Sequence, residues 1–356
     1  MAKKHKVKRF KESVGLDIGS HSIKLVHLKR MHDGFKLLNY AIKPTIPDGV
    51  EYSISDLRKD RFPTSLIDIF KSLRMKPRSI KRLVSSIGGD NTSLKQIKTI
   101  FLPEEELESA LFFEAKKHLP ISGGEMLLDF QVLNVEEKTN NMNILLAAST
   151  KSMLSEHTDI LQQAGVAPGL VDVESLAIAN CYALNTLSEE GTHIILNIGA
   201  HKTNMIIYGA NAKFFARDIP WGGFHMTRDI MRQRDISFED AERFKIEHGL
   251  GDEAQETEST GAVLDIAEKS TVEQIAVEVR RSLRFYVKEA GNSDFRKVLL
   301  VGGSAKISGL PEYLEKAINI PTEVFNPFVN LEMPDKFRDT QDPQLALAIG
   351  LAMRPE

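Results

Sequence analysis

Two short stretches of the chain carry residue types suited to binding a phosphate. They are VGLDIGSHSIKLVHL at 14–28 and IILNIGAHKTNMIIY at 194–208, which align without a gap at an offset of 180 residues. In each, an apolar run ends in Asp17 or Asn197, a glycine follows, and a second β-rich run begins. A glycine beside a small residue lets backbone N–H groups approach an anion closely. The aligned pair predicts a duplicated unit whose two turns hold a polyphosphate; two ordinary hairpins are the alternative.

A third glycine turn follows another apolar run. In the stretch that begins at Lys297, a buried strand is expected to end at Gly302, Gly303 and Ser304, and a helix to begin near Pro311. Paired glycines at the end of a strand leave bare backbone on which a ligand can lie. As the third such turn in one chain, it strengthens the prediction of a phosphate-containing ligand.

The elements that position these turns are read from apolar periodicity. The dinucleotide motif G-x-G-x-x-G and the phosphate motif G-x-x-x-x-G-K-[ST] do not occur, which argues against Rossmann and P-loop folds. Beyond the duplicated unit, strands are expected at 36–42, 83–87, 95–102, 126–135, 142–149 and 212–219. Helices are expected at 66–73, 103–118, 171–187, 238–249, 272–290 and 345–353. One more helix is expected to end near 163, and another to begin at a cap at Thr227.

Two of these expected helices are rich in small residues. The segments at 171–187 and 345–353 could cross closely, which a hinge between two lobes requires; two buried helices in separate cores are the alternative. The pattern of strands and helices at 83–168 predicts an inserted subdomain with its own core. Its first helix carries Phe112 and Phe113 side by side, so one helix cannot easily bury both against one sheet. We expect either a boundary groove or an apolar docking surface there.

Composition restricts the class of protein. The 356 residues exceed what one core usually organises, so two or more domains are expected. The net charge of −3 argues against nucleic acid as the main partner, and no apolar run is long enough to span a membrane. The single Cys181 excludes an internal disulfide framework and favours a reducing cytoplasm. Residues 1–12 are expected to form a flexible basic tail, either simply solvated or attracted to an anionic membrane face.

The three turns together resemble those of the actin-like ATPase superfamily. The residues that carry the likeness are Asp17, Gly19, Ser20 and Lys24 in a first phosphate loop, Gly199 in a second, and Gly302, Gly303 and Ser304 in an adenosine motif. The segments around Glu174 and Gly350 look like the two connecting helices of the superfamily. The resemblance implies an α/β, actin-like (ribonuclease H-like) duplicated fold of two lobes that binds ATP and Mg²⁺ in the cleft between them.

An insertion after the first phosphate loop is similar to the extra subdomain of FtsA and PilM proteins. The implied division is a first-lobe core at 13–82, 169–190 and 339–356; an inserted subdomain at 83–168; a second-lobe core at 191–230 and 294–338; and an accessory subdomain at 231–293. Within this group the stretches HLPISGGEMLLDFQVL, LVDVESLAIAN, AERFKIEHG and LVGGSAKISGLPEYL are most similar to the PilM family of type IV pilus assembly proteins. FtsA is disfavoured because the sequence stops at Glu356 without an amphipathic membrane-binding helix.

The resemblance also implies a role for each site residue. Asp17 would face the Mg²⁺ shell, and Lys24 would neutralise phosphate charge. Phosphate oxygens would be held by Ser20, Ser22, Gly19, Gly199 and Thr203. The adenosine would lie against Glu242, Lys245, Gly302, Gly303, Ser304 and Lys306. Asn197 stands where the superfamily usually has Asp; an amide carries no charge, so we expect slow or absent hydrolysis, well below ~1 per second.

The PilM likeness implies a cytoplasmic scaffold at the inner membrane. Such a protein would hold the N-terminal cytoplasmic segment of a PilN-like membrane protein in a groove lined partly by the inserted subdomain, and would link the alignment complex to the pilus motor ATPases. Self-association is left open. Two alternatives are a small-molecule phosphotransferase of the actin-like and sugar kinase group, for which we find no convincing catalytic base, and an FtsA-like filament-forming protein.

Overall fold

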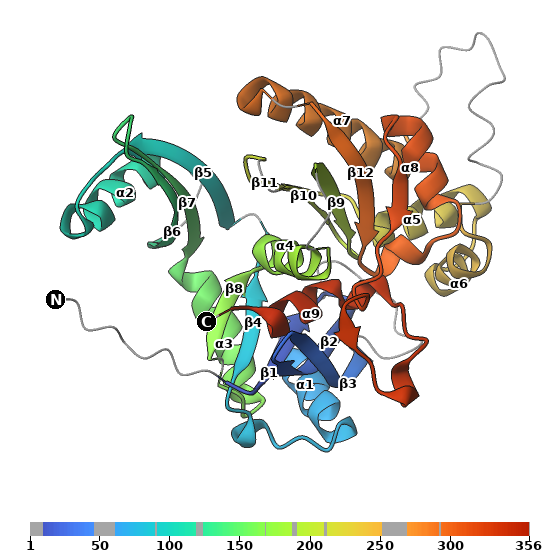
Figure 1. The fold of residues 1–356 in the computed structure, drawn as a ribbon. Coiled ribbons are helices and arrows are strands. Elements are labelled where there is room, and N and C mark those ends of the chain that lie inside the picture. Colours follow the sequence, from blue (N-terminus) through green and yellow to red (C-terminus); the bar gives the residue numbers. More distant parts are fainter. Residues whose placement is uncertain are drawn as a thin grey trace, which may run out of the picture. The chain divides into compact units, whose positions relative to one another are not determined.

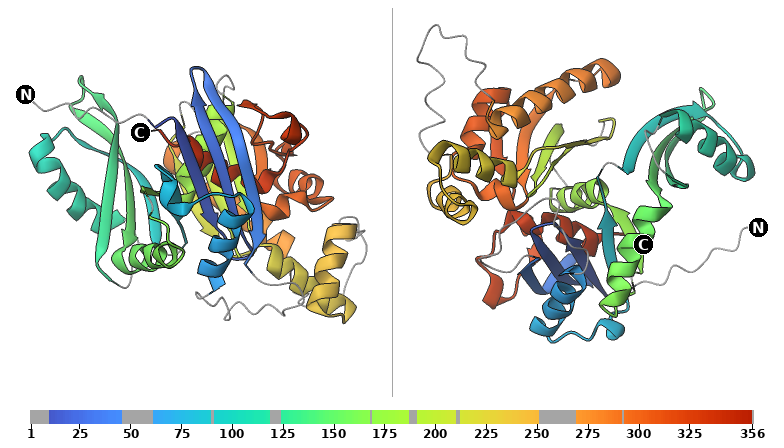
Figure 2. Two further views of the ribbon diagram at one scale, coloured as in Figure 1. Left: turned by 90° about the horizontal axis from the view of Figure 1, so that it is seen from below. Right: turned by 180° about the vertical axis from the view of Figure 1, so that it is seen from behind.

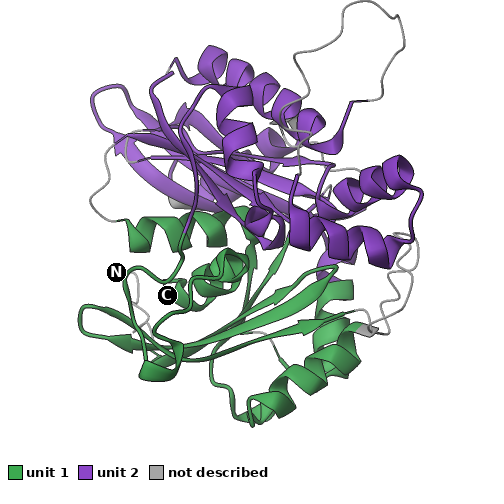
Figure 3. Ribbon diagram, turned by 90° about the vertical axis from the view of Figure 1, so that its right-hand side faces the viewer, with its two compact units in different colours: residues 1–87, 156–189, 326–356 green, residues 88–155, 190–325 purple. Residues whose placement is uncertain are grey.

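The computed structural model forms two compact units, shown in Figure 3. It describes residues 10–45, 61–89, 91–118, 124–167, 169–186, 191–209, 212–250, 269–291 and 293–355. Unit 1 comprises residues 1–87, 156–189 and 326–356, and unit 2 comprises residues 88–155 and 190–325. Most of the expected basic tail, residues 1–9, lies outside the described ranges. Within those ranges, no helix is both long and apolar enough to cross a membrane.

Unit 1 is built on a six-stranded sheet in the order β14-β3-β2-β1-β4-β8. Its strands are β1 (Glu12–Ile18), β2 (Ser22–Met31), β3 (Gly34–Pro44), β4 (Leu83–Ile87), β8 (Leu170–Val173) and β14 (Leu331–Glu332). The first three strands form an antiparallel meander, visible as the long blue strands in Figure 2, and β4 and β8 extend it in parallel. The strand-turn-strand expectation for the first stretch is therefore confirmed.

Helices cover both faces of this sheet. Alternate residues of β1 point to opposite sides and so pack against different helices. They are α1 (Arg61–Ser72), α3 (Lys151–Gln163), α4 (Glu174–Asn185) and α9 (Ala346–Met353). Val14 and Leu16 pack with α1 and the end of α3 in one core cluster. Gly15, between them in sequence, faces α9: a Cβ there would lie 2.0 Å from the Ala348 carbonyl oxygen.

The two small-residue helices, α4 and α9, pack against each other within unit 1. A Cβ on Gly350 would lie 1.8 Å from the carbonyl oxygen of Ala177, so the backbones touch at this point. The expected close crossing is confirmed, and the alternative of two separate cores is wrong. The expected helix at 171–187 begins later, because its first residues form β8 beside β4. A hinge function for this crossing stays a prediction.

Unit 2 contains a five-stranded sheet in the order β11-β10-β9-β12-β13. Its strands are β9 (Thr192–Ile198), β10 (Thr203–Tyr208), β11 (Phe215–Ile219), β12 (Phe295–Val301) and β13 (Thr322–Val324). Strands β9 to β11 repeat the antiparallel meander of unit 1, and β12 adds in parallel, as β4 does there. The two sheets therefore share one plan, as the aligned stretches predict.

Helices α7 and α8 bury one face of the second sheet. The helices of this part are α5 (Gly223–Arg234), α6 (Phe238–His248), α7 (Thr271–Ala290) and α8 (Leu310–Ile318). Ile275 and Val279 of α7 and Leu314 of α8 join the apolar side chains of β9, β10 and β12 in one buried cluster. Thr227 lies inside α5 rather than capping it, because the helix begins at Gly223 with Gly222 as its N-cap. Short 3₁₀ helices occur at Pro77–Ser79, Gly303–Lys306, Asp335–Phe337 and Pro343–Leu345.

A three-stranded sheet also belongs to unit 2 (Figure 1), and it has its own small core. It consists of β5 (Thr92–Ile100), β7 (Asn141–Thr150) and β6 (Met126–Glu136), with α2 (Glu104–His118) packed on one face. The two ends of the stretch assigned to the inserted subdomain, 83–168, contact the first sheet and its core. β4 pairs with β1 in the first sheet, and Leu161 of α3 is buried in the core of unit 1. The subdomain boundaries assigned from the sequence, including those at 83 and 168, stay predictions.

One part-buried contact between α3 and β4 makes the stability of unit 1 depend on pH. His157 Nε2 lies 2.8 Å from Ser85 Oγ, and burial lowers the pKa of His157 to about 4. Above an unfolded pKa of about 6.5, His157 is neutral in both states. As pH falls from there toward 4, the unfolded chain binds a proton that the folded chain does not. Stability is therefore full above pH ~6.5 and falls by about 3 kcal/mol below pH ~4.

This loss can be measured by denaturant unfolding at pH 7.5 and 4.5. We expect His157→Gln, which keeps a polar side chain and cannot titrate, to remove about 2 to 3 kcal/mol of the difference between the two pH values. Carboxylates titrate equally in both proteins and cancel in this comparison. An identical pH dependence for both proteins would show that His157 protonates freely in the folded state.

Candidate functional site

The first glycine turn joins β1 to β2 and places a carboxylate beside an ammonium. Asp17 and Lys24 are directly opposite across the two strands, and Asp17 Oδ2 lies 3.1 Å from Lys24 Nζ. Gly19 makes this possible, because a Cβ there would lie 2.9 Å from that Nζ and from the Ser22 carbonyl oxygen. Ser22 is buried. The turn therefore brings together the residues that the sequence assigns to it.

The rest of this turn is tied to the end of β3. Thr45 donates its hydroxyl to the carbonyl of Ser20 at 2.6 Å, and its backbone N–H donates to the carbonyl of His21. Among the described residues, no three His, Cys, Asp or Glu side chains gather as metal ligands. Asp17 is a single carboxylate, which fits Mg²⁺ when phosphate and water supply the other ligands.

The second glycine turn joins β9 to β10 and is packed against the start of α5. The N–H groups of Gly223 and Phe224 donate to the carbonyls of Gly199 and Ala200 at 2.9 and 2.8 Å. Gly222 allows this approach, because a Cβ there would lie 2.7 Å from the Gly199 oxygen. The first N–H groups of α5 are thereby satisfied by the turn itself. This helix N-terminus holds the turn in place rather than an anion.

Two residues assigned to the second turn differ in their surroundings. Thr203 is completely buried and donates its hydroxyl to the carbonyl of Trp221 at 2.8 Å, so it supports the turn in this conformation. Asn197 is partly exposed, and its Oδ1 would lie 2.6 Å from a Cβ on Gly302. Asn197 therefore connects the second turn with the third.

The third turn begins at Gly302, whose φ of 89° and ψ of 172° suit glycine alone. The next residue, Gly303, is exposed, and a Cβ there would meet nothing within 4 Å. The hydroxyl of Ser304 donates to the carbonyl of Gly199 at 3.4 Å. Lys306 ends the short helix with its side chain exposed. The second and third turns are thus held together, with bare backbone at Gly303.

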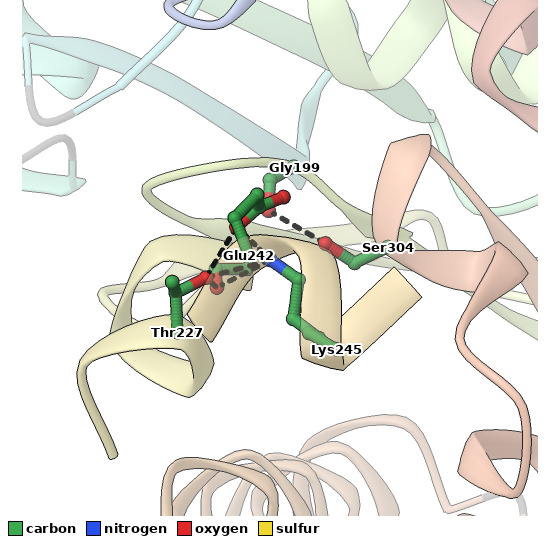
Figure 4. Close-up of polar contacts among 6 residues, drawn as sticks. Gly199, Thr227, Glu242, Lys245 and Ser304 are labelled. Atoms are coloured by element: carbon green, nitrogen blue, oxygen red, sulfur yellow. Dashed lines mark hydrogen bonds and ion pairs between the residues drawn. The ribbon is translucent and has the colours of Figure 1, made fainter. Parts of the chain in front are cut away.

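A polar cluster from α5 and α6 lies beside these turns (Figure 4). Lys245 Nζ donates to Glu242 Oε2 at 2.6 Å, to Thr227 Oγ1 at 2.7 Å and to the Gly223 carbonyl at 3.1 Å. These three bonds use all three donors of an ammonium. Burial is the main cause that lowers the pKa of Lys245, and Glu242 opposes it. Lys245 therefore has a structural role: its buried ammonium holds the other members of the cluster together.

Glu242 is the member of the cluster that a ligand can reach. Its Oε2 accepts from both Lys245 and Thr227, the latter at 2.5 Å. Its side chain is 27% exposed, and within the described residues Oε1 is the carboxylate oxygen left to accept a further hydrogen bond. A ribose hydroxyl is a donor of the right kind for this atom.

The structure thus forms two groups from the predicted site residues. Asp17, Gly19, Ser20, Ser22 and Lys24 lie in unit 1, and the other nine lie in unit 2. Sequence reasoning gave no site role to Gly222, Thr227, or the pair Lys202 and Asp218. The two glycines after Trp221 are the sequence feature that could have indicated Gly222. No local pattern connects Lys202 with Asp218.

The repeated plan of the two sheets, each with a glycine turn between its first two strands, is that of the actin-like ATPase fold. A solved structure titled "PilM-PilN type IV pilus biogenesis complex" has this fold, with a TM-score of 0.80, 22% identity, and coverage of 98% of this chain and 100% of that one. The ethanolamine utilization protein EutJ from Carboxydothermus hydrogenoformans is more distant, with a TM-score of 0.53, 15% identity, and coverage of 97% and 90%.

The chain belongs to the family described as "Type IV pilus assembly protein PilM", whose sequence profile matches residues 15–356. Among curated proteins it is similar to the cell division protein FtsA of Helicobacter pylori strain J99, at 23% identity over 234 residues, which is 59% of this chain and 46% of that protein. FtsA of Neisseria meningitidis is 24% identical over 174 residues, covering 44% and 41%. The chain spans about half the length of the curated relatives it matches.

Proposed function

We propose that this chain is an ATP-binding scaffold of type IV pilus assembly. The match to the PilM family over 15–356 is the observation that carries the proposal, and the fold shared with the PilM-PilN complex supports it. In this role the chain binds the N-terminal cytoplasmic segment of a PilN-like inner-membrane protein. It is recruited through that partner to the cytoplasmic face of the membrane and contacts the motor ATPases.

The nucleotide part of the proposal is supported by the three glycine turns. Asp17 would face a Mg²⁺ ion that ATP brings with it, and Lys24 and Ser22 would hold phosphate oxygens beside Gly19. In unit 2, Gly302 and Gly303 present bare backbone to the nucleoside, and Glu242 Oε1 accepts from the ribose. The bound Mg²⁺ would supply charge compensation to the phosphates.

Hydrolysis is proposed to be slow or absent. Asn197 occupies the place of the carboxylate that would organise a metal-bound water, and its amide lies against the third turn at Gly302. An uncharged amide orients such a water more weakly than a carboxylate does. ATP then acts chiefly by stabilising one conformation of the chain, which is how a ligand shifts a conformational equilibrium.

The partner part of the proposal is supported by exposed apolar side chains on the inserted subdomain. Its exposed large residues are Ile100, Phe101, Phe113, Leu133 and Val135. Phe113 of α2 is 64% exposed, whereas Phe112 is half-buried with Lys116 over its ring at 4.5 Å. Large apolar side chains left exposed on a subdomain are candidates for contact with a protein segment, and Phe113 is the most exposed of the five.

The proposal is tested by co-purification of the full chain with the cytosolic N-terminal peptide of a PilN-like protein encoded by the same organism. We expect the wild-type chain to retain this peptide, and Phe113→Asp to weaken binding at least ~10-fold, because a charge replaces an apolar contact. Val329→Asp is the matched control, since Val329 is 61% exposed in unit 1.

The same preparations are then titrated with ATP and Mg²⁺, which both variants should bind as the wild type does. A wild-type chain that retains no peptide would refute the scaffold function. One that binds peptide but no nucleotide would refute only the ATP-binding part.

A further inference from the structure

The second glycine turn carries an ammonium and carboxylate pair that lies outside the assigned residues. Lys202 Nζ is 2.9 Å from Asp218 Oδ2, and Asn204 donates its side-chain N–H to Asp218 Oδ1 at 2.6 Å. The side chains of Lys202 and Asp218 are 32% and 22% exposed, so the pair is half-buried rather than a solvated surface contact. Lys202 is the last residue of the turn before β10, and Asp218 lies on β11.

This pair corresponds to Asp17 and Lys24 of the first turn, although it is built from different positions. The residues aligned with Asp17 and Lys24 at the offset of 180 are Asn197 and Asn204, two neutral amides. In the second turn the ammonium belongs to Lys202, two residues before the aligned position. The carboxylate belongs to Asp218, on the next strand of the meander. Each glycine turn therefore keeps one carboxylate and one ammonium.

Strand register shows which face of the second sheet carries the pair. Asn197 is opposite Asn204, and Asn204 is opposite Asp218. Directly opposed residues point to the same face, so these three side chains form one row about 10 Å long. Their sequence neighbours Ile198 and Ile219 point to the other face, into the buried cluster with α7 and α8. The ammonium of Lys202, paired with Asp218, thus lies on the same face of the sheet as Asn197.

A phosphate at this turn is bound more strongly when a positive side chain lies beside the backbone, because hydrogen bonds between charged groups are stronger than those from neutral N–H groups. The Gly199 N–H donates to the Lys202 carbonyl at 2.9 Å, and the first N–H groups of α5 donate to the turn. The ammonium of Lys245 is used up within its own cluster. Lys202 is the ammonium that belongs to the turn itself, and Asp218 fixes its position.

We propose that Lys202 is a phosphate-binding residue of the second glycine turn and that Asp218 is the positioning residue that holds its ammonium there. This inference rests on the proposed nucleotide binding and adds one ligand that the sequence motif does not contain. Asp218 also restores to this sheet face the negative charge that Asn197 lacks, so the ammonium is kept in place before a nucleotide arrives. When phosphate binds, the ammonium shares its donors between phosphate and Asp218.

The test is calorimetric titration of the full chain with ATP and Mg²⁺, and separately with adenosine. We expect Lys202→Met to weaken ATP binding by about 10- to 100-fold, the range for one charge-assisted hydrogen bond. Adenosine binding should stay unchanged, because it has no phosphate. Lys202→Arg should restore ATP binding to within a few-fold. Lys297→Met removes an exposed ion pair of the same unit and is the control.

Asp218→Asn separates positioning from direct contact. We expect it to weaken ATP binding less than Lys202→Met does, and the double variant to be no weaker than Lys202→Met, because Asp218 acts only through Lys202. A wild-type chain that binds ATP while Lys202→Met binds it equally well overturns this inference alone. Loss of adenosine binding in Lys202→Met, or failure of Lys202→Arg to bind ATP, also overturns it, since the role is then structural. A wild-type chain that binds no nucleotide overturns both proposals.

Discussion

Replacing Gly350 with alanine is expected to destabilise the protein by at least about 4 kcal/mol. A Cβ at this position would lie 1.8 Å from the carbonyl oxygen and 2.6 Å from the carbonyl carbon of Ala177. Both contacts are with backbone, which no rotamer change can relieve. The helices α4 and α9 would have to separate, and the side chains they bury, such as Ile349 and Cys181, would lose their packing.

Helix propensity alone predicts that Gly350→Ala makes the protein more stable. Alanine in a helix interior is favoured over glycine by about 1 kcal/mol. The two effects differ enough in size for denaturant unfolding to decide between them. Gly303→Ala is the control, since a Cβ there meets nothing within 4 Å and we expect less than about 1 kcal/mol of change. A Gly350→Ala variant as stable as the wild type would mean that the α4 and α9 backbones do not touch as described.

Much of this fold could be predicted because the decisive signals are local. The strands of each meander alternate in apolar character, and the glycines mark the turns between them, so the duplication is visible in the sequence itself. The helix at 272–290 is similarly well marked: Ser270 caps it and Gly291 ends it with a positive φ. Patterns of this kind depend on residues within one turn or one strand of each other.

What could not be predicted depends on pairing between distant segments. The sequence predicts the strand at 83–87, but nothing in its own residues specifies that it pairs with β1, about 70 residues earlier, on one side and with β8 on the other. The same holds for Lys202 and Asp218, which meet only because β10 and β11 pair in one register. The role of Lys245 also depends on packing, because a lysine three residues from a glutamate is ordinarily a solvated pair.

The paired glycines of the third turn are expected to respond very differently to substitution. For Gly302→Ala we expect a loss of stability of roughly 3 kcal/mol or more. Its φ of 89° and ψ of 172° lie in a region that only glycine adopts readily. A Cβ would also lie 2.6 Å from the Ile198 carbonyl oxygen. We expect thermal unfolding of this variant to show a clearly lower melting temperature than the wild type, even without ligand.

For Gly303→Leu we expect the reverse: a melting temperature within about 3 °C of the wild type and nucleotide binding at least ~10-fold weaker. Gly303 is exposed and has open space at its Cβ, so the fold can accept a side chain there. In the proposed function that same space is occupied by the nucleoside, which lies on the bare backbone. Gly303→Ala should fall between the wild type and Gly303→Leu in affinity, because the blocked volume is smaller. If Gly303→Leu folds and binds ATP as tightly as the wild type, the nucleoside does not lie on this turn. The second glycine of the pair would then need another explanation, because open space at its Cβ means that the fold itself does not require glycine at this position.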